Sequence, residues 1–191
     1  MPRSLGRLDI DMVRKRYRRL VIDASVLGAA GGGHAEHPTS KSCRDFLLEV
    51  LTICHHAVIT DKIAEEWQEH VSRLAFKWRR TMTAKKKIVT ATVDADSRIR
   101  TAIERAIGDA ISSDEILKDI ALVEAALETD KIIISLDENA RHAFSELAQQ
   151  IPELRTIVWI NPANPSEQAI AWLQQGANRQ KLRLLGSLQH P

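Results

Sequence analysis

The sequence is poor in cysteine and in long hydrophobic runs, and both shortages exclude whole classes of protein. Its two cysteines, Cys43 and Cys54, are too few for the disulfide framework of a small secreted domain or for a four-cysteine zinc site. No apolar run approaches the roughly 20 residues of a membrane-spanning helix. Residues 1–20 carry charges where a signal peptide has its apolar core. We therefore expect a cytoplasmic protein that does not enter a membrane.

Two well-defined ligand motifs are also missing. The glycines Gly28 and Gly31 to Gly33 follow the spacing G-x-x-G-G-G, which differs from the G-x-G-x-x-G of a dinucleotide-binding loop. The seven histidines form no H-E-x-x-H motif, and their spacing to the cysteines is not that of zinc ligands. A dinucleotide cofactor and a zinc centre are therefore both disfavoured.

The charges are unevenly distributed along the 191 residues, although the net charge is only +2. Residues 1–20 hold seven basic and two acidic side chains, and residues 71–90 hold seven basic and no acidic ones. Residues 109–130 reverse the sign, with seven acidic side chains against one lysine. This pattern is consistent with a polyanion held beside a cation site, but such runs are also typical of solvated helix faces.

Short apolar strands alternate with amphipathic helices over most of the chain. Strands are predicted at residues 19–25, 57–60, 131–135 and 155–160, and residues 81–93 show no clear pattern. This order favours an α/β fold, a three-layer α/β/α domain with a central, mostly parallel sheet. We expect a basic N-terminal extension at 1–18, the domain at 19–176 and a C-terminal tail at 177–191.

Four acidic side chains occupy positions that this fold would bring together. Asp23 follows the first predicted strand and Asp137 follows the third, so both belong to the carboxyl edge of the sheet, where such proteins bind ligands. Glu66 and Asp119 border apolar helix faces, where a carboxylate is costly unless it is paired, hydrogen-bonded or bound to a cation. Converging acids repel one another, and Mg²⁺ or Mn²⁺ relieves that repulsion. Such an ion lowers the pKa of a bound water and stabilises displacement at a phosphate.

The same part of the chain resembles the PIN-domain nucleases. The segments that carry the resemblance are, in order, RLVIDASVL, ITDKIAEEW, DEILKDIALVEAAL and DKIIISLDENA, from about residue 19 to residue 160. In that family an aspartate ends the first strand, a glutamate lies on a following helix, and two further aspartates complete the site. The positions that match are Asp23, Glu66, Asp119 and Asp137. Ser25 and Ser135 would then orient ligands or water.

The resemblance implies a metal-dependent endoribonuclease that hydrolyses RNA with Mg²⁺ or Mn²⁺ and a metal-activated water. Many members of the family are toxins that pair with an antitoxin. Candidate partners are therefore RNA, an antitoxin protein and a second copy of the chain. Backbone attraction to RNA is expected from Lys85, Lys86 and Lys87 and from the N-terminal arginines. Two alternatives stay open: a PIN-like module that binds RNA or protein without cleaving, and a structure-specific DNA nuclease.

The pattern also leaves some residue assignments open. Glu65 competes with Glu66 and Asp114 with Asp119, because the pattern alone does not fix their placement to a single residue. Ordinary structural roles compete with ligand roles as well: an aspartate after a strand can cap the next turn, and a helical glutamate can pair with His70 one turn on. The four tryptophans follow apolar stripes, so we expect them in the core rather than stacked on bases.

Overall fold

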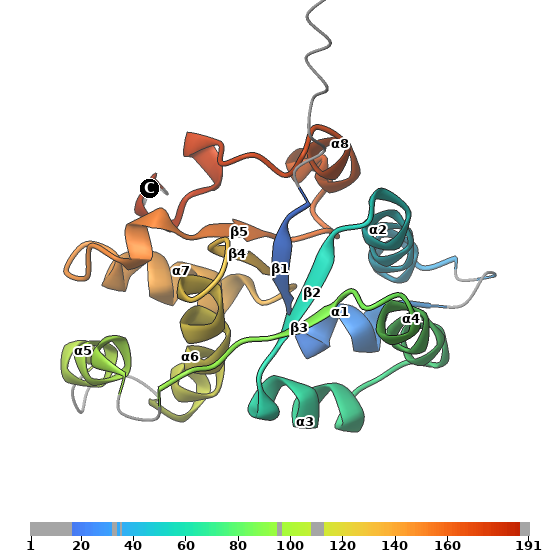
Figure 1. The fold of residues 1–191 in the computed structure, drawn as a ribbon. Coiled ribbons are helices and arrows are strands. Elements are labelled where there is room, and N and C mark those ends of the chain that lie inside the picture. Colours follow the sequence, from blue (N-terminus) through green and yellow to red (C-terminus); the bar gives the residue numbers. More distant parts are fainter. Residues whose placement is uncertain (1–16, 32–33, 35, 95–96, 108–112, 188–191) are drawn as a thin grey trace, which may run out of the picture.

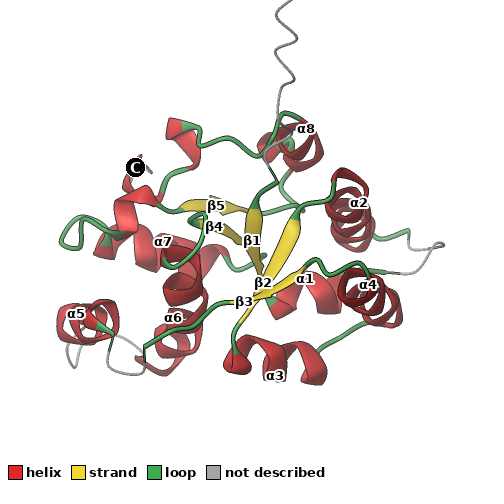
Figure 2. Cartoon of the chain, in the orientation of Figure 1, coloured by secondary structure: helices red, strands yellow, loops and turns green. Residues whose placement is uncertain are grey.

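The computed structural model describes residues 17–31, 34, 36–94, 97–107 and 113–187, and for 113–118 it describes the backbone alone. The described chain forms a five-stranded parallel sheet with helices on both faces (Figure 1; Figure 2). This confirms the predicted three-layer α/β architecture with a parallel sheet. No helix within these ranges is long and apolar enough to cross a membrane.

The sheet is built from short strands in the order β3-β2-β1-β4-β5. Its strands are β1 (Arg19–Ile22), β2 (His56–Ile59), β3 (Ile88–Thr90), β4 (Ile132–Ile134) and β5 (Val158–Ile160). Strands β1, β4 and β5 contain runs of buried, mostly β-branched residues, which is typical of a parallel sheet covered on both faces. The sequence did not predict β3, because this edge strand is half-exposed and only three residues long.

Two groups of helices cover opposite faces of this sheet. The helices are α1 (Ala24–Ala29), α2 (Pro38–Ile53), α3 (Asp61–Glu69), α4 (Arg73–Ala84), α5 (Arg98–Ile107), α6 (Ser113–Leu127), α7 (Glu138–Leu147) and α8 (Ala169–Gln174). Helix α2 contacts α1, α4 and α8, whereas α6 contacts α5 and α7 (Figure 1). The chain moves outward from β1 to β2 and β3 and then returns to β4 beside β1. The neighbouring strands β1 and β4 therefore form the switch point, where open α/β sheets bind ligands.

Buried tryptophans anchor the helices to the sheet. All four tryptophans are buried, as the sequence predicted. The indole Nε1 of Trp67 donates to the carbonyl of Ile22 at 2.8 Å, and that of Trp78 donates to the carbonyl of Leu47 at 2.6 Å. These bonds hold α3 against the end of β1 and α4 against α2, so the carboxyl edge of the sheet has a fixed helical neighbour.

Residues 61–84 form two helices, although their apolar residues follow one continuous stripe from Ile63 to Trp78. Ser72 starts the second helix, because its hydroxyl accepts a hydrogen bond from the amide of Ala75 at 3.1 Å. The break follows His70, whose carbonyl oxygen would lie 2.7 Å from a Cβ at Gly28. Glycine at this position thus lets α1 approach the end of α3 closely.

The described part of the expected tail, residues 177–187, packs against the domain. Ala177 and Leu185 are buried, and Leu184 forms a bridge with Val158 of β5. This segment contains only short 3-10 turns, at Lys181–Arg183 and Leu185–Ser187. It therefore has no helical periodicity from which its structure could be predicted. Most of the expected basic extension, residues 1–16, lies outside the described residues.

Candidate functional site

Asp23 lies at the switch point directly after β1, and two serines hold its carboxylate. The hydroxyls of Ser25 and Ser135 both donate to its Oδ2, the second at 2.7 Å. The oxygen of Ser25 in turn accepts from the amide of Leu136 at 3.2 Å. The oxygen of Ser135 accepts from the amide of Asp137 at 3.0 Å. Two backbone amides after β4 thereby orient both hydroxyls, and each hydroxyl donates a hydrogen bond to Asp23.

The two strand-end aspartates use their carboxylates differently. Asp137 caps α7, since its Oδ1 accepts from the amide of Ala140 at 2.8 Å. The ordinary capping role is therefore present at Asp137. Asp23 stands at the corresponding position before α1 but makes no capping hydrogen bond with its side chain. Within the described residues its Oδ1 has no hydrogen-bond partner and is not fully buried, so this oxygen is accessible to a ligand.

Asp119, on α6, lies within electrostatic reach of the other three predicted acids. Burial raises the pKa of its carboxyl to about 7, and the charges of Asp23, Asp137 and Glu66 act in the same direction. The charge of Lys62 acts in the opposite direction. The structure thus brings the four acids of the sequence prediction to one edge of the sheet, from the ends of β1 and β4 and from α3 and α6.

Glu66 faces this group from α3. Burial raises the pKa of its carboxyl, Lys62 lowers it, and the charge of Asp23 raises it again. Glu65 is exposed whereas Glu66 is half-buried, which favours Glu66 of the two candidates. The ion pair of His70 is with Glu69, at 3.9 Å, although its charge also lowers the pKa of Glu66. The side chain of the other alternative, Asp114, lies outside the described residues.

The predicted lysine cluster at residues 85–87 lies at the amino-terminal ends of the strands, opposite the carboxyl edge where the acids lie. These residues immediately precede β3, and the carbonyl of Lys87 accepts from the amide of Ala57 near the start of β2. The Lys87 ammonium donates to the carbonyl of Leu51 at 3.3 Å. Asp23, in contrast, follows the end of β1. The structure therefore does not bring Lys85, Lys86 or Lys87 to the acids.

The acids have the donor chemistry of a divalent cation site, but no complete ligand set is in place. Within the described ranges, none of Asp23, Glu66, Asp119 and Asp137 forms an ion pair with lysine or arginine. Carboxylate oxygens of this kind suit Mg²⁺ and Mn²⁺. However, no three histidine, cysteine or acidic side chains in the described residues converge closely enough to hold one ion directly. An ion bound here would complete its shell with water, as Mg²⁺ usually does.

A cavity of about 500 Å³ lies beside the start of α3, and none of the four acids lines it. Its lining residues are Thr60, Asp61, Lys62, Thr90, Ala91, Thr92, Val93, Asp94, Arg100, Ala121 and Glu124. Lys62 links the two features, because it lines the cavity and its charge acts on both Glu66 and Asp119. Sequence reasoning overlooked Lys62. Its position one helical turn before Glu66 was the available signal.

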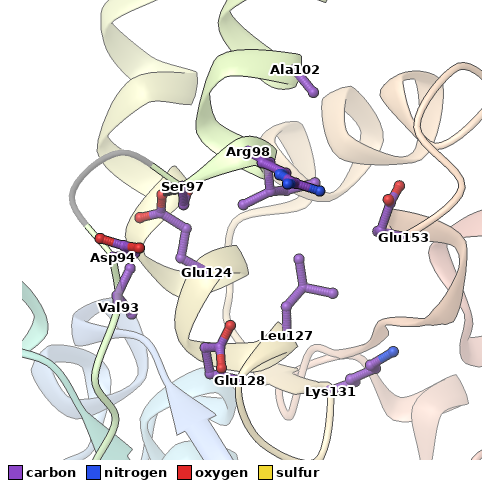
Figure 3. Close-up of a pocket in the computed structure, with 11 residues that line it drawn as sticks. Val93, Asp94, Ser97, Arg98, Ala102, Glu124, Leu127, Glu128, Lys131 and Glu153 are labelled. Carbon is purple, nitrogen blue, oxygen red and sulfur yellow. Dashed lines mark hydrogen bonds between the residues drawn. The ribbon is translucent and has the colours of Figure 1, made fainter.

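A second cavity, of about 370 Å³, lies beside α5 and α6, and the buried acid of its lining, Glu124, is paired within the fold (Figure 3). Glu124 accepts from Arg100 at 3.0 and 2.6 Å and from the hydroxyl of Ser97 at 2.5 Å. Figure 3 shows Glu124 beside Ser97, with Glu153 on the far side of the cavity. Since this carboxylate is paired and hydrogen-bonded, it ties α5 to α6.

Comparison of the chain with protein-family models, with curated proteins and with solved structures gives no match. The fold is therefore established from the coordinates alone, as an α/β domain with a five-stranded parallel sheet. Because unrelated functions share such folds, the function has to be argued from the site.

Proposed function

We propose that this protein is a metal-dependent endoribonuclease of the PIN-domain type. The observation that carries the proposal is the gathering of four acids at the switch point without a lysine or arginine ion-paired to them in the described residues. Burial and mutual repulsion raise the pKa of Asp119 to about 7. An arrangement this unfavourable for the apo protein is typical of a functional site.

The order and spacing of the acids add support from the sequence. Asp23 ends β1, Glu66 lies on α3, Asp119 lies on α6, and Asp137 follows β4. This is the order in which the PIN-domain nucleases carry their acids, and it is the basis of the resemblance. The preference for RNA also rests on that resemblance, since a site of this chemistry can act on either nucleic acid.

In this proposal each acid of the site has its own role. A divalent cation, when bound, supplies a water of lowered pKa and offsets negative charge on the phosphate. Asp23, held by Ser25 and Ser135, presents its accessible Oδ1 in one orientation. Asp119 has to release its proton to bind the cation, so binding is expected to strengthen as the pH rises. Glu66 is the acid that α3 contributes to the site.

The proposal is tested by incubating the full chain with single-stranded RNA and with DNA of the same sequence. Each substrate is combined with Mn²⁺, with Mg²⁺, or with either ion and excess chelator. We expect internal cleavage of RNA that requires the ion and stops with chelator. Cleavage restricted to DNA would favour the DNA nuclease. RNA binding without cleavage under all conditions would favour the non-cleaving module.

A further inference from the structure

Lys62 is an exposed cation placed between the acid group and a cavity. It lies in the first turn of α3, after the cap residue Thr60 and one turn before Glu66. Within the described residues Lys62 forms no direct ion pair or hydrogen bond, so its ammonium is available to a ligand. A strongly basic point charge next to a metal-binding acid group is suited to a phosphate.

The cavity behind Lys62 has the size and lining of a nucleoside site. Its volume of about 500 Å³ falls within the range of small-molecule pockets. Ala91, Val93 and Ala121 give it apolar walls, against which a flat base can pack. Thr92 and Asp94 contribute polar side chains that can bond to the edge of a base or to a ribose hydroxyl.

The charges in this cavity favour Lys62 as the phosphate ligand. Arg100 is the other cation of the lining, and it is already bonded to both carboxylate oxygens of Glu124. Asp94, on the segment after β3, is acidic and would repel a phosphate bound beside it. A nucleotide therefore fits with its phosphate at Lys62 and its base against the apolar walls.

We propose that Lys62 and this cavity form the subsite for the nucleotide next to the scissile bond. Lys62 binds the phosphate, and the walls formed by Ala91, Val93 and Ala121 hold the base. This inference rests on the proposed nuclease function. It adds that the substrate is single-stranded at this point, because a base inside a duplex could not enter the cavity.

The test compares Lys62→Gln with Lys62→Arg, which keeps the charge, and with Lys181→Gln, an exposed lysine outside the site. Steady-state cleavage of a short single-stranded RNA is measured with Mn²⁺. Binding of AMP, CMP, GMP and UMP is measured separately by calorimetry with Mn²⁺ present. Loss of one charge-assisted contact is expected to raise KM about tenfold in Lys62→Gln. The kcat should stay within about threefold, Lys62→Arg should restore KM, and Lys181→Gln should match the parent.

A second variant tests the cavity without touching the charge. Ala121→Leu places a larger side chain in the cavity wall and should weaken nucleotide binding by a similar factor. Thr92→Phe, at an exposed position of the rim, replaces it if Ala121→Leu fails to fold. Unchanged nucleotide binding in a folded, cavity-filled variant would overturn the assignment of the cavity.

The rival role for Lys62 is that of a counter-ion to the acids. In that case Lys62→Gln would shift the pH profile and the apparent affinity for Mn²⁺ but leave KM for RNA unchanged, which would overturn the subsite. If the parent cleaves nothing, the nuclease proposal fails by itself. Nucleotide binding that requires Lys62 and Mn²⁺ would still support the subsite, and its absence would refute it.

Discussion

Two buried acidic groups in this protein are stabilised in opposite ways. Glu167 is 7% exposed and is paired with two arginines, Arg141 at 2.7 Å and Arg183 at a short distance. Asp23 is 9% exposed, and its described hydrogen-bond donors are the neutral hydroxyls of Ser25 and Ser135. The first group is neutralised within the fold, whereas the second has no cationic partner among the described residues.

The same contrast recurs on a single helix. On α6, Glu124 is 2% exposed and is bonded to Arg100 and Ser97, which fasten α5. Asp119, five residues earlier, faces three other acids, and its pKa is raised to about 7. Burial alone therefore does not explain the difference between these two acids. A cationic partner stabilises Glu124 within the fold, whereas none of the described residues forms an ion pair with Asp119.

Asp23→Asn should give the largest effect on activity and little loss of stability. The amide keeps the shape of the side chain but removes the charge that binds the cation, so metal-dependent RNA cleavage should fall by about a thousandfold. The melting temperature should stay the same or rise, because repulsion among the acids decreases. Cleavage rates and thermal melts of both proteins check this. Full activity, or an unfolded variant, would refute the ligand role.

Glu167→Gln should have the converse effect. It leaves Arg141 and Arg183 buried without their carboxylate, which is expected to lower the free energy of unfolding by about 3–5 kcal/mol. Urea titration measures the loss. Under conditions where the variant is folded, its kcat should equal that of the parent. If a stable variant lost kcat specifically, Glu167 would also take part in activity. The distinction between the Glu167 group and the acids around Asp23 would then fail.

The pH dependence of stability should separate Asp119 from an exposed acid just beyond the end of the same helix. Its folded-state pKa of about 7 lies above the unfolded value of 3.8, so the unfolded chain loses this proton first. The stability that the protonated Asp119 carboxyl gives to the folded state is fully present below about pH 4. It declines as the pH rises and is lost above about pH 7. Asp119→Asn should therefore raise the metal-free melting temperature at pH 8 but not at pH 4. The exposed Glu128→Gln is the control and should show no such difference.

Ser135→Ala should give the smallest of these effects. The variant removes one of the two hydroxyl donors to Asp23 and is expected to lower kcat by about tenfold with little change in KM for RNA. Ser145→Ala is a matched control, because Ser145 is also buried but bonds to the carbonyl of His142 on α7. Equal activity of the two variants would show that the orientation of Asp23 does not matter.

Much of this fold could be predicted because its strands and helices have clear periodic patterns. The strands around Val21, Ile133 and Trp159 are continuous apolar runs, and the alternation with helices indicates a parallel sheet. Strand β3 was missed because its three residues are half-exposed. The break at Ser72 was missed because the apolar stripe continues across it, and only the capping hydrogen bond reveals the new helix.

The places of the candidate acids in the fold could be predicted, but what surrounds them could not. Asp23 and Asp137 follow directly from the ends of their strands, since parallel strands share one carboxyl edge. Lys62 and the adjoining cavity depend on how α3, α6 and the segment after β3 pack, which no local pattern encodes. The position of residues 85–87 depends on the same packing. They precede β3 and so lie at the ends of the strands opposite the carboxyl edge.

The central claim is that the acids around Asp23 require an external cation, and Mn²⁺ binding tests it most directly. Calorimetric titration of the metal-free protein at pH 8 should show saturable binding that is lost in Asp23→Asn and retained in Glu167→Gln. Binding should weaken at pH 5, because Asp119 then holds its proton. No binding by the parent, or equal binding by the parent and Asp23→Asn, would contradict the account.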